Sequence, residues 1–332
     1  MSFLKTFLNQ PIGYGTAPLG NMFRDVPEEE AQATIESVWN EGIRYFDTAP
    51  FYGAGLAETR LGEFLKDKPR DEYIISTKVG RLISDEKEDK SGTGLFEYGN
   101  QNKIIQDYTA EGTRKSIEDS LERLQTDYLD IVYVHDISPD FHGDEWISLF
   151  DEARKGAFKV LQEMKEEGVI RDWGLGVNLP LPIEVALGLE ETVPTLSLQA
   201  THYTLMNHHS ALNSLMPLAE EKGSGIVVGG PYNSGALLGG DHYDYAPASE
   251  ETKQHAQELK KIANQHGVSL KAAALQFSTA HPAVAAVIPG STRPDRIKED
   301  IAALKETIPE AFWNELREKN LISKDAPLPG SN

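Results

Sequence analysis

Short apolar runs alternate with longer amphipathic segments along almost the whole chain. Apolar runs this short are typical of buried strands, and the longer segments place their apolar residues on one face of a helix. The predicted strands are residues 12–16, 43–47, 73–77, 129–134, 172–177, 195–200, 225–229 and 283–289. The predicted helices are residues 27–40, 57–65, 113–124, 148–167, 181–187, 208–221, 269–279 and 293–304.

This alternation indicates an α/β fold, and eight strands with eight helices predict a (β/α)8 TIM barrel. A doubly wound sheet is the alternative, and it would carry a G-x-G-x-x-G sequence between its first strand and first helix. Residues 13–20 are rich in glycine, but they lack that spacing and open no helix. No linker divides the chain, so we predict a single barrel domain over residues 1–332.

Two long segments interrupt the pattern. Residues 80–108 and 233–249 are predicted as loops, and an additional helix at 250–266 follows the second. Loops of this length are usually functional or disordered, and in a barrel they would lie over the C-terminal face of the strands. Phe96 and Tyr98 in the first loop are candidates for the wall of a substrate site. The last residues, 320–332, are predicted to be irregular.

Three predicted strands end in, or are closely followed by, residues suited to proton transfer. Asp47 ends one strand and is followed by Tyr52, Lys78 follows the next strand, and His135 follows the strand after that. In a barrel these side chains would meet at one face. An ammonium group about 4 Å from a phenol is worth about 4 kcal/mol at an effective dielectric of about 20, which would lower the phenol pKa by roughly 3 units.

The four residues together therefore predict a Tyr52 that titrates near neutral pH, although burial opposes this shift. Asp47 is expected to hold Lys78, and His135 to orient the reacting oxygen. No side chain in this set transfers electrons, so the chemistry requires a hydride carrier.

Each of these residues also has a simpler interpretation. Asp47 can cap a turn, Tyr52 can be a half-buried aromatic residue, Lys78 can lie on the surface and His135 can be a polar core residue. The catalytic interpretation depends on the four occurring together. A metal-dependent barrel is a further alternative, but the available histidines and carboxylates lack a spacing that requires a metal, so we predict none.

Composition limits the possible partners. The formal net charge is −20 and the pI is about 4.9, so nucleic acid binding is not expected. No apolar run is long enough for a membrane helix, and residues 1–10 do not resemble a signal peptide. The chain has no cysteine, which excludes disulfides and fits a cytoplasmic location. A small-molecule substrate is therefore the expected partner, and the oligomeric state is left open.

At this point the sequence resembles the aldo-keto reductase family over about residues 12–310. The motifs that carry the resemblance are Ile43-Arg-Tyr-Phe-Asp-Thr-Ala-Pro-Phe-Tyr-Gly53, Ser76-Thr-Lys-Val-Gly80, Leu129-Asp-Ile-Val-Tyr-Val-His135, Gly174-Leu-Gly-Val-Asn178 and Ile288-Pro-Gly-Ser-Thr-Arg-Pro-Asp-Arg-Ile297. The resemblance implies a (β/α)8 barrel and a catalytic tetrad of Asp47, Tyr52, Lys78 and His135. It also implies a nicotinamide dinucleotide bound without a Rossmann domain.

The resemblance further implies which residues hold that cofactor. The positions that match are Gly15, Thr16, Asn178, Gln199, Gly230, Pro231, Tyr232, Ser234, Gly235, Gly290, Ser291, Thr292, Arg296, Glu299 and Asp300. The chain departs from the family pattern twice. Gly229 stands where an aromatic residue commonly stacks on the nicotinamide, which leaves Tyr232 as a candidate. Gly290 replaces a lysine that commonly pairs with the 2′-phosphate of NADP, so NAD is the expected cofactor, with NADP as the alternative because Arg296 remains.

Within the family the pattern looks most like the aldose 1-dehydrogenase and pyridoxal 4-dehydrogenase branch. That likeness implies NAD-linked oxidation of an aldose at C1, of the L-fucose or D-arabinose type, or of pyridoxal, with Asp136 as a further substrate contact. A general NADPH-dependent aldehyde reductase is the enzymatic alternative. A barrel that binds the cofactor but serves as a regulatory subunit is the non-enzymatic alternative.

Overall fold

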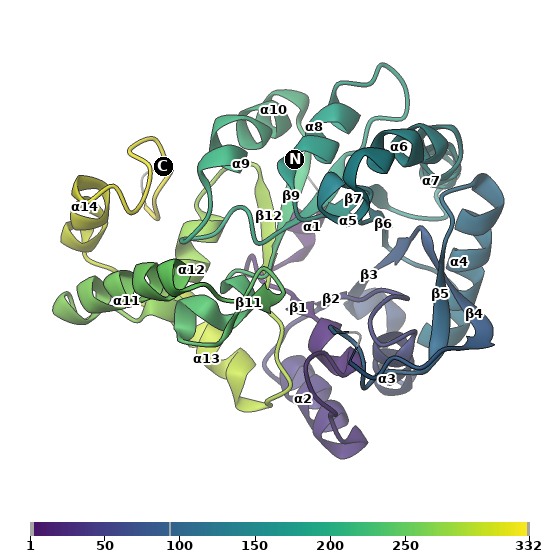
Figure 1. The fold of residues 1–332 in the computed structure, drawn as a ribbon, viewed down its shortest axis with the longest axis horizontal. Helices are drawn as coiled ribbons and strands as arrows, with labels where there is room; N and C mark the ends of the chain where they lie inside the picture. The colour runs from purple at the N-terminus through teal and green to yellow at the C-terminus, as the bar shows by residue number, and fades with distance from the viewer. Residues whose placement is uncertain (1–2, 93, 331–332) are drawn as a thin grey trace.

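The computed structural model describes residues 3–92 and 94–330, and its central feature is an eight-stranded parallel sheet (Figure 1). Its strands, in spatial order, are β1 (Tyr14–Gly15), β2 (Tyr45–Asp47), β3 (Ile74–Val79), β6 (Ile131–His135), β7 (Asp172–Val177), β8 (Leu196–Ala200), β9 (Gly225–Gly229) and β12 (Val284–Ile288). Parallel bridges from Ile12 to Val287 and from Gly15 to Gly290 join the first strand to the last. The predicted (β/α)8 TIM barrel is confirmed.

Successive residues of each strand face the barrel interior and the surrounding helices in turn. In β2, Tyr45 belongs to the interior core, whereas Phe46 belongs to the core between the sheet and the helices. In β6, Ile131 and Tyr133 face inward in the same way, and Val132 faces the helices. This alternation follows from the two-residue period of a strand. It places every second residue at the C-terminal strand ends inside the barrel.

Helices surround the barrel, as Figure 1 shows from one end. They are α2 (Glu28–Asn40), α3 (Leu56–Leu65), α4 (Ala110–Leu124), α6 (Trp146–Lys155), α7 (Ala157–Glu166), α8 (Pro180–Leu187), α9 (His209–Asn213), α10 (Leu215–Lys222), α12 (Leu270–Thr279) and α13 (Asp295–Leu304), with the additional α11 (Glu250–Gln265) outside them. Three of them begin at side-chain caps, in which Thr109, Ser249 and Ser269 accept hydrogen bonds from backbone N–H groups of the first turn.

Two predicted helices are interrupted. The segment 148–167 forms α6 and α7, which are separated at Gly156, where the backbone passes so close to the Tyr108 carbonyl that a Cβ atom would lie 2.6 Å from that oxygen. The segment 208–221 is divided at Ser214 into α9 and α10. In the first case a tertiary contact causes the break, and the helical pattern on either side does not reveal it.

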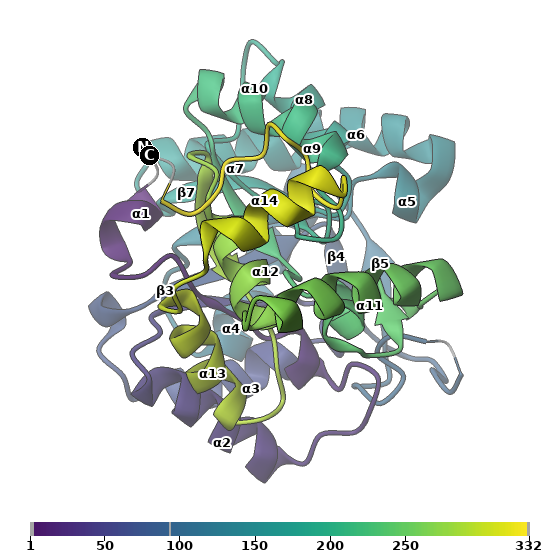
Figure 2. The same cartoon turned by 90° about the vertical axis from the view of Figure 1, so that its left-hand side faces the viewer.

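Two helices at the ends of the described chain were not predicted. The first is α1 (Phe3–Phe7), whose Leu4 is fully buried in the interior core, so α1 closes the end of the barrel where the strands begin. The second is α14 (Glu310–Glu318), which buries Phe312, Trp313 and Leu316. Figure 2 shows α14 beside α12 and α11, with α1 at the opposite end of the barrel from α11.

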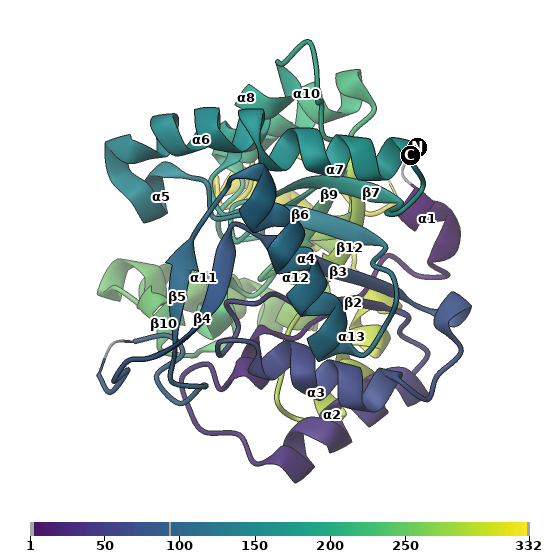
Figure 3. The same cartoon turned by 90° about the vertical axis from the view of Figure 1, so that its right-hand side faces the viewer.

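The segment 80–108 is not the patternless loop predicted from the sequence. It contains the antiparallel strands β4 (Arg81–Lys87) and β5 (Asn102–Gln106), in which Leu82 pairs with Ile105 and Ile83 with Ile104. These strands are only partly buried, and their many polar residues hide the alternation. Figure 3 shows the hairpin at the end of the barrel opposite α1.

The remaining elements are short and lie between the barrel strands. They are η1 (Ala17–Gly20), η2 (Arg70–Glu72), α5 (Pro139–His142), η3 (Gly143–Glu145), η4 (Asn233–Leu238), β10 (His242–Tyr243) and β11 (Ala246–Pro247). Within the described ranges, no helix is both long and apolar enough to cross a membrane.

Candidate active site

The ends of three neighbouring strands bring Asp47, Lys78 and His135 together inside the barrel. Asp47 is paired with Ser76 across β2 and β3, and Lys78 is paired with Tyr133 across β3 and β6. Lys78 therefore lies two residues beyond the partner of Asp47, and His135 lies two residues beyond the partner of Lys78. All three side chains occupy inward positions of the strand alternation. The three polar side chains therefore lie directly above an interior core that includes Tyr45. This is the C-terminal face of the barrel, where barrel enzymes place their active sites.

Asp47 and Lys78 form a fully buried ion pair. The Lys78 Nζ atom donates hydrogen bonds to Asp47 Oδ2 at 2.8 Å and to the Thr48 carbonyl at 2.8 Å, while Ser76 Oγ donates to Asp47 Oδ1 at 2.7 Å. Burial raises the pKa of Asp47, and the charge and hydrogen bond of Lys78 offset this only in part. These three hydrogen bonds fix the ammonium group in one position.

Tyr52 lies on a turn that follows β2, and its phenol does not have the pKa predicted from the sequence. The Lys78 Nζ atom is 4.6 Å from the centre of the Tyr52 ring. However, burial raises the pKa of Tyr52 well above its ordinary value, and the charges of Asp47 and Asp136 raise it further while that of Arg81 lowers it. The pKa of Tyr52 therefore moves away from neutrality and not toward it, because burial is the largest cause and the Asp47 charge acts in the same direction.

The turn that carries Tyr52 is held by a close backbone contact. Gly53 has a φ of +67°, and a Cβ atom there would lie 2.3 Å from the Gly20 carbonyl oxygen. Only glycine accepts both this backbone conformation and this approach. The contact joins the turn after β2 to η1, which lines the same region of the site.

His135 is buried and neutral. Burial lowers its pKa well below the ordinary value, and the charges of Lys78 and Arg81 lower it further. The Tyr108 hydroxyl donates to the His135 carbonyl at 2.7 Å, which anchors the backbone from the end of the β4–β5 segment. The His135 Nε2 atom lies 3.5 Å from Asp136 Oδ2, whereas its Nδ1 atom is buried without a hydrogen-bond partner among the described residues.

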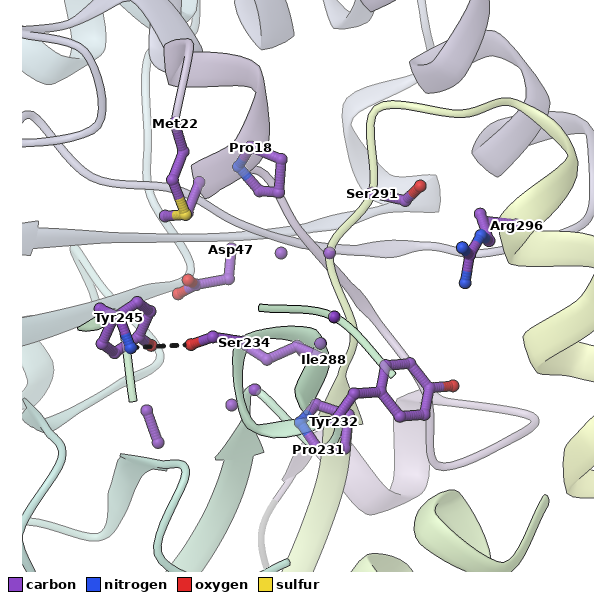
Figure 4. A pocket seen from close by; sticks show the side chains of 18 of the residues that line it. Pro18, Met22, Asp47, Pro231, Tyr232, Ser234, Tyr245, Ile288, Ser291 and Arg296 are labelled. Carbon is purple, nitrogen blue, oxygen red and sulfur yellow. Dashed lines mark hydrogen bonds between the residues drawn. The ribbon is translucent and has the colours of Figure 1, made fainter. Parts of the chain in front are cut away.

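Two cavities meet at Tyr52. The larger, about 410 Å³, extends from Asp47 and Tyr52 to the loops after β9 and β12. The smaller, about 60 Å³, lies against Lys78 and His135. The side chains or backbone that line both cavities belong to Ala17, Met22, Tyr52, Leu198, Ala200 and Tyr245. Figure 4 looks into the larger cavity, with Asp47 and Tyr245 at one side and Arg296 at the other.

Most residues that the sequence predicts for cofactor binding line the larger cavity. They are Gly15, Gly230, Pro231, Tyr232, Ser234, Gly235, Gly290, Ser291, Arg296 and Asp300. Arg293 also lines it, and the sequence prediction missed this residue. Neither the Arg293 nor the Arg296 guanidinium forms a direct ion pair with another described residue, although the charge of Arg296 also interacts with the carboxylates of Asp300 and Glu299.

Three predicted cofactor residues lie behind the cavity walls or in the smaller cavity. Thr16 Oγ1 and Gln199 Oε1 are buried and have no hydrogen-bond partner in the described part of the chain. Gln199 Nε2 donates to the Asn178 carbonyl at 3.0 Å. Asn178 lines the smaller cavity, and its Nδ2 donates to Asp140 at 2.9 Å. Contact of Thr16 or Gln199 with a ligand requires a small movement of the wall.

Two others point elsewhere. Thr292 Oγ1 accepts a hydrogen bond from Arg24 at 2.6 Å and does not line the cavity. Glu299 is exposed and pairs with Lys271 at 2.6 Å, because it lies on the outer side of α13. The structure does not bring these two side chains to the cavity.

Tyr232 is not near the tetrad, in contrast to its prediction as the ring that supports a nicotinamide. Its hydroxyl donates to Asp300 Oδ1 at 2.7 Å, which directs the ring toward α13 and away from Asp47 (Figure 4). Tyr245 lies beside Tyr52 instead, and its backbone N–H donates to Ser234 Oγ at 2.9 Å. The length of the loop at 233–249 was the only sequence signal for this residue.

The smaller cavity has mainly aromatic and aliphatic walls. Phe96 is buried and packs against Phe51, with 5.1 Å between ring centroids, and it lines the cavity together with Asp136. Tyr98 does not, since it is 48% exposed, its hydroxyl interacts with Glu97 and its carbonyl accepts a hydrogen bond from Asn21 at 2.8 Å. The structure does not bring Tyr98 to this cavity, because the turn that directs Phe96 inward directs Tyr98 outward.

Asp136 follows His135 and forms the second buried ion pair of the site. Its Oδ2 atom lies 2.7 Å from Arg81 Nη2. Burial raises the pKa of Asp136 to about 6, against the opposing charge of Arg81. In the described ranges, His, Asp and Glu side chains form no cluster of three or more that could hold a metal ion.

Comparisons with known proteins agree with this architecture. The model of the aldo/keto reductase family matches residues 11–321. Pyridoxal 4-dehydrogenase of Microbacterium luteolum is 37% identical over 330 residues, and D-threo-aldose 1-dehydrogenase of a Pseudomonas species is 36% identical over 321 residues, each with 94% of both chains covered. The holo form of an aldo-keto reductase from Bacillus halodurans superposes with a TM-score of 0.71 at 26% identity, covering 97% of this chain and 94% of that chain.

Proposed function

The chain belongs to the aldo/keto reductase family and is an oxidoreductase, and we propose that it oxidises a cyclic hemiacetal to a lactone in an NAD-linked reaction. The proposed substrate is an aldose, oxidised at C1, or pyridoxal. The observation that carries this proposal is that Tyr52 lines both cavities. A dinucleotide in the larger cavity and a small substrate in the smaller one would therefore meet at a single phenol. The names of the two similar dehydrogenases support the substrate class.

The larger cavity fits the cofactor of this family. Aldo-keto reductases use nicotinamide cofactors, and a dinucleotide carries a negatively charged pyrophosphate. The chain has a net charge of −20, yet this cavity is lined by the unpaired Arg293 and Arg296. Guanidinium groups suit phosphate oxygens. We assign the adenosine and pyrophosphate end to these arginines and to Ser291, and the nicotinamide end to Gly15, Asn178 and Gln199. When bound, the cofactor supplies the hydride acceptor.

The tetrad transfers the proton between Tyr52 and the substrate oxygen. In oxidation, Tyr52 accepts the proton of the substrate hydroxyl, and in reduction it donates one to the carbonyl oxygen. His135 is neutral, and its Nε2–H donates a hydrogen bond that orients that oxygen. Lys78, fixed by Asp47, lies 4.6 Å from the centre of the Tyr52 ring, where its charge would stabilise the phenolate that takes up the proton. Because the pKa of Tyr52 is raised, oxidation is expected to accelerate as the pH rises and reduction is expected to be favoured at lower pH.

The packing around Gly290 supports a proposed preference for NAD. A Cβ atom on Gly290 would lie 2.8 Å from the Gly15 carbonyl and 3.0 Å from Pro18, because the bridge between residues 15 and 290 closes the barrel here. The chain thus offers no lysine at a position where family members commonly carry one for the phosphate of NADP. We therefore favour NAD. A general NADPH-dependent aldehyde reductase is the second candidate, and the two unpaired arginines favour it.

Initial rates test the proposal directly. Turnover is measured with NAD and NADP on L-fucose, D-arabinose and pyridoxal, and with NADH and NADPH on a simple aromatic aldehyde. We expect NAD-linked oxidation of a sugar or of pyridoxal. Turnover confined to aldehydes with NADPH would select the second candidate. In parallel, Tyr52→Phe is expected to lower turnover by about 10²–10⁴-fold while cofactor binding, followed by protein fluorescence, persists.

A further inference from the structure

One carboxylate, that of Asp136, lines the smaller cavity among mainly apolar side chains. Of the two charged side chains that line it, Lys78 donates hydrogen bonds to Asp47 and Thr48. Asp136 is the other, and it is the only carboxylate among the described residues that line this cavity. A buried carboxylate is costly unless it is paired and hydrogen-bonded. Its presence beside the tetrad therefore calls for an explanation beyond packing.

Arg81 forms an ion pair with Asp136 but does not use all of its capacity to accept hydrogen bonds. The guanidinium is fixed above the Phe51 ring, with 4.1 Å from Cζ to the ring centroid, and it also approaches Phe141 at 5.1 Å. Its ion pair with Asp136 joins Nη2 to Oδ2 at 2.7 Å. A carboxylate accepts about four hydrogen bonds. Asp136 therefore keeps the capacity to accept a hydrogen bond from a molecule in the cavity.

The position of this carboxylate defines which donor would reach it. Asp136 Oδ2 lies 3.5 Å from His135 Nε2, the atom assigned to the reacting oxygen. Oxygen atoms on neighbouring carbons of a sugar are separated by about the length of a hydrogen bond. A substrate whose reacting oxygen contacts His135 would thus place the oxygen of the adjacent carbon near Asp136.

We infer that Asp136, held by Arg81, is a specificity-determining residue that accepts a hydrogen bond from a hydroxyl on the carbon next to the reacting carbon. The inference rests on the proposed function and narrows it to aldoses and other 2-hydroxy carbonyl compounds. Pyridoxal is disfavoured, because the ring carbon attached to its reacting carbon bears no hydroxyl. A site that hydrogen-bonds a substrate hydroxyl discriminates strongly against an analogue without it, since the buried acceptor is then left unpaired.

A matched pair of sugars tests this inference. 2-Deoxy-D-ribose is D-arabinose without its C2 hydroxyl, so the ratio of the two kcat/KM values isolates that group. We expect the wild-type protein to favour D-arabinose by at least about 100-fold, and Asp136→Asn to reduce this ratio to below about tenfold. Arg81→Gln is expected to reduce it in the same direction. Asp144→Asn is the charge-matched control, because it removes an exposed carboxylate that does not line the cavity. This variant is expected to leave the ratio unchanged.

A ratio separates recognition from damage to the fold, because a structural defect lowers both kcat/KM values together. An unchanged ratio in Asp136→Asn would overturn the inference. Reduction of 2-hydroxypropanal and propanal with NADH distinguishes the inference from the proposed function. If no sugar is oxidised but 2-hydroxypropanal is preferred and Asp136→Asn removes that preference, the function fails and the inference stands. If D-arabinose and 2-deoxy-D-ribose are oxidised equally well, the function stands and the inference fails.

Discussion

The two ends of the larger cavity are built in different ways. At the tetrad end, Asp47 and Lys78 come from the C-terminal ends of β2 and β3, are at most 2% exposed and pair with each other. At the other end, Arg293 and Arg296 come from the segment after β12, are at least partly exposed and form no ion pair with described residues. Under the proposed function, this difference assigns the chemistry to the barrel strands and the strength of cofactor binding to surface side chains. Substitutions at the tetrad end should therefore lower turnover and stability, whereas substitutions at the other end should mainly raise the KM for the dinucleotide.

The largest effect is expected at the buried pair. Lys78→Met should lower turnover by about 10³-fold and destabilise the fold by about 3–5 kcal/mol, because it leaves Asp47 buried without its cation. Steady-state kinetics and urea unfolding measure the two effects. The double variant Asp47→Asn with Lys78→Met should recover most of the stability and none of the turnover. A double variant as unstable as the single one would contradict this account of the pair.

The ion pair between Asp136 and Arg81 makes the stability of the fold depend on pH. Asp136 has a pKa raised to about 6, with burial as the main cause and with Arg81, Asp140 and Lys78 as the neighbouring charges. Between about pH 4 and pH 6 the folded state binds more protons at this group than the unfolded state, so its contribution to stability falls as the pH rises. From about pH 4 to pH 6, the unfolding free energy of Asp136→Asn should therefore rise by about 3 kcal/mol relative to that of the wild type. Urea unfolding at pH 4, 5, 6 and 7 measures the difference, and a constant difference would show that folding does not raise the pKa of Asp136.

The turn that carries Tyr52 should respond to a smaller perturbation. Gly53→Ala places a Cβ atom against the Gly20 carbonyl and should displace the phenol, lowering kcat by about 30-fold, since misplacement of a reacting group by about 1 Å can cost 10²-fold. Gly42→Ala is the matched control, because Gly42 also has a positive φ, of +86°, but nothing lies within 4 Å of its Cβ position. Equal losses of kcat in the two variants would mean that backbone strain, and not the contact, is responsible.

The smallest effect is expected at the open end. Arg296→Met should raise the KM for the dinucleotide by about tenfold and change kcat little, because it removes one partly exposed charge-assisted contact. Lys298→Met is the control on the same helix, since Lys298 is 71% exposed and pairs with Glu41 away from the cavity. The comparison between the two ends would fail if Arg296→Met abolished turnover as Lys78→Met does, or if both substitutions raised KM equally.

Features with a local cause could be predicted from the sequence. The eight barrel strands and most of the helices follow from apolar periodicity, which is a property of neighbouring residues. The convergence of Asp47, Lys78 and His135 followed from their places at consecutive strand ends, because parallel strands of a barrel end at one face. The glycine-rich and arginine-containing segments around the larger cavity could be assigned only by resemblance to a family.

Features that depend on contacts between distant segments required the tertiary structure. The division of residues 148–167 at Gly156, the outward direction of Tyr98 and the placing of Tyr245 beside Tyr52 all result from packing that no local pattern encodes. The pKa of Tyr52 is the clearest case. The sequence supplied a lysine and a tyrosine, but only the structure showed that Asp47 balances the lysine and that burial dominates. Sequence determined which groups meet at the barrel mouth, and the surrounding desolvation and pairing, which are properties of the folded whole, decided their charge.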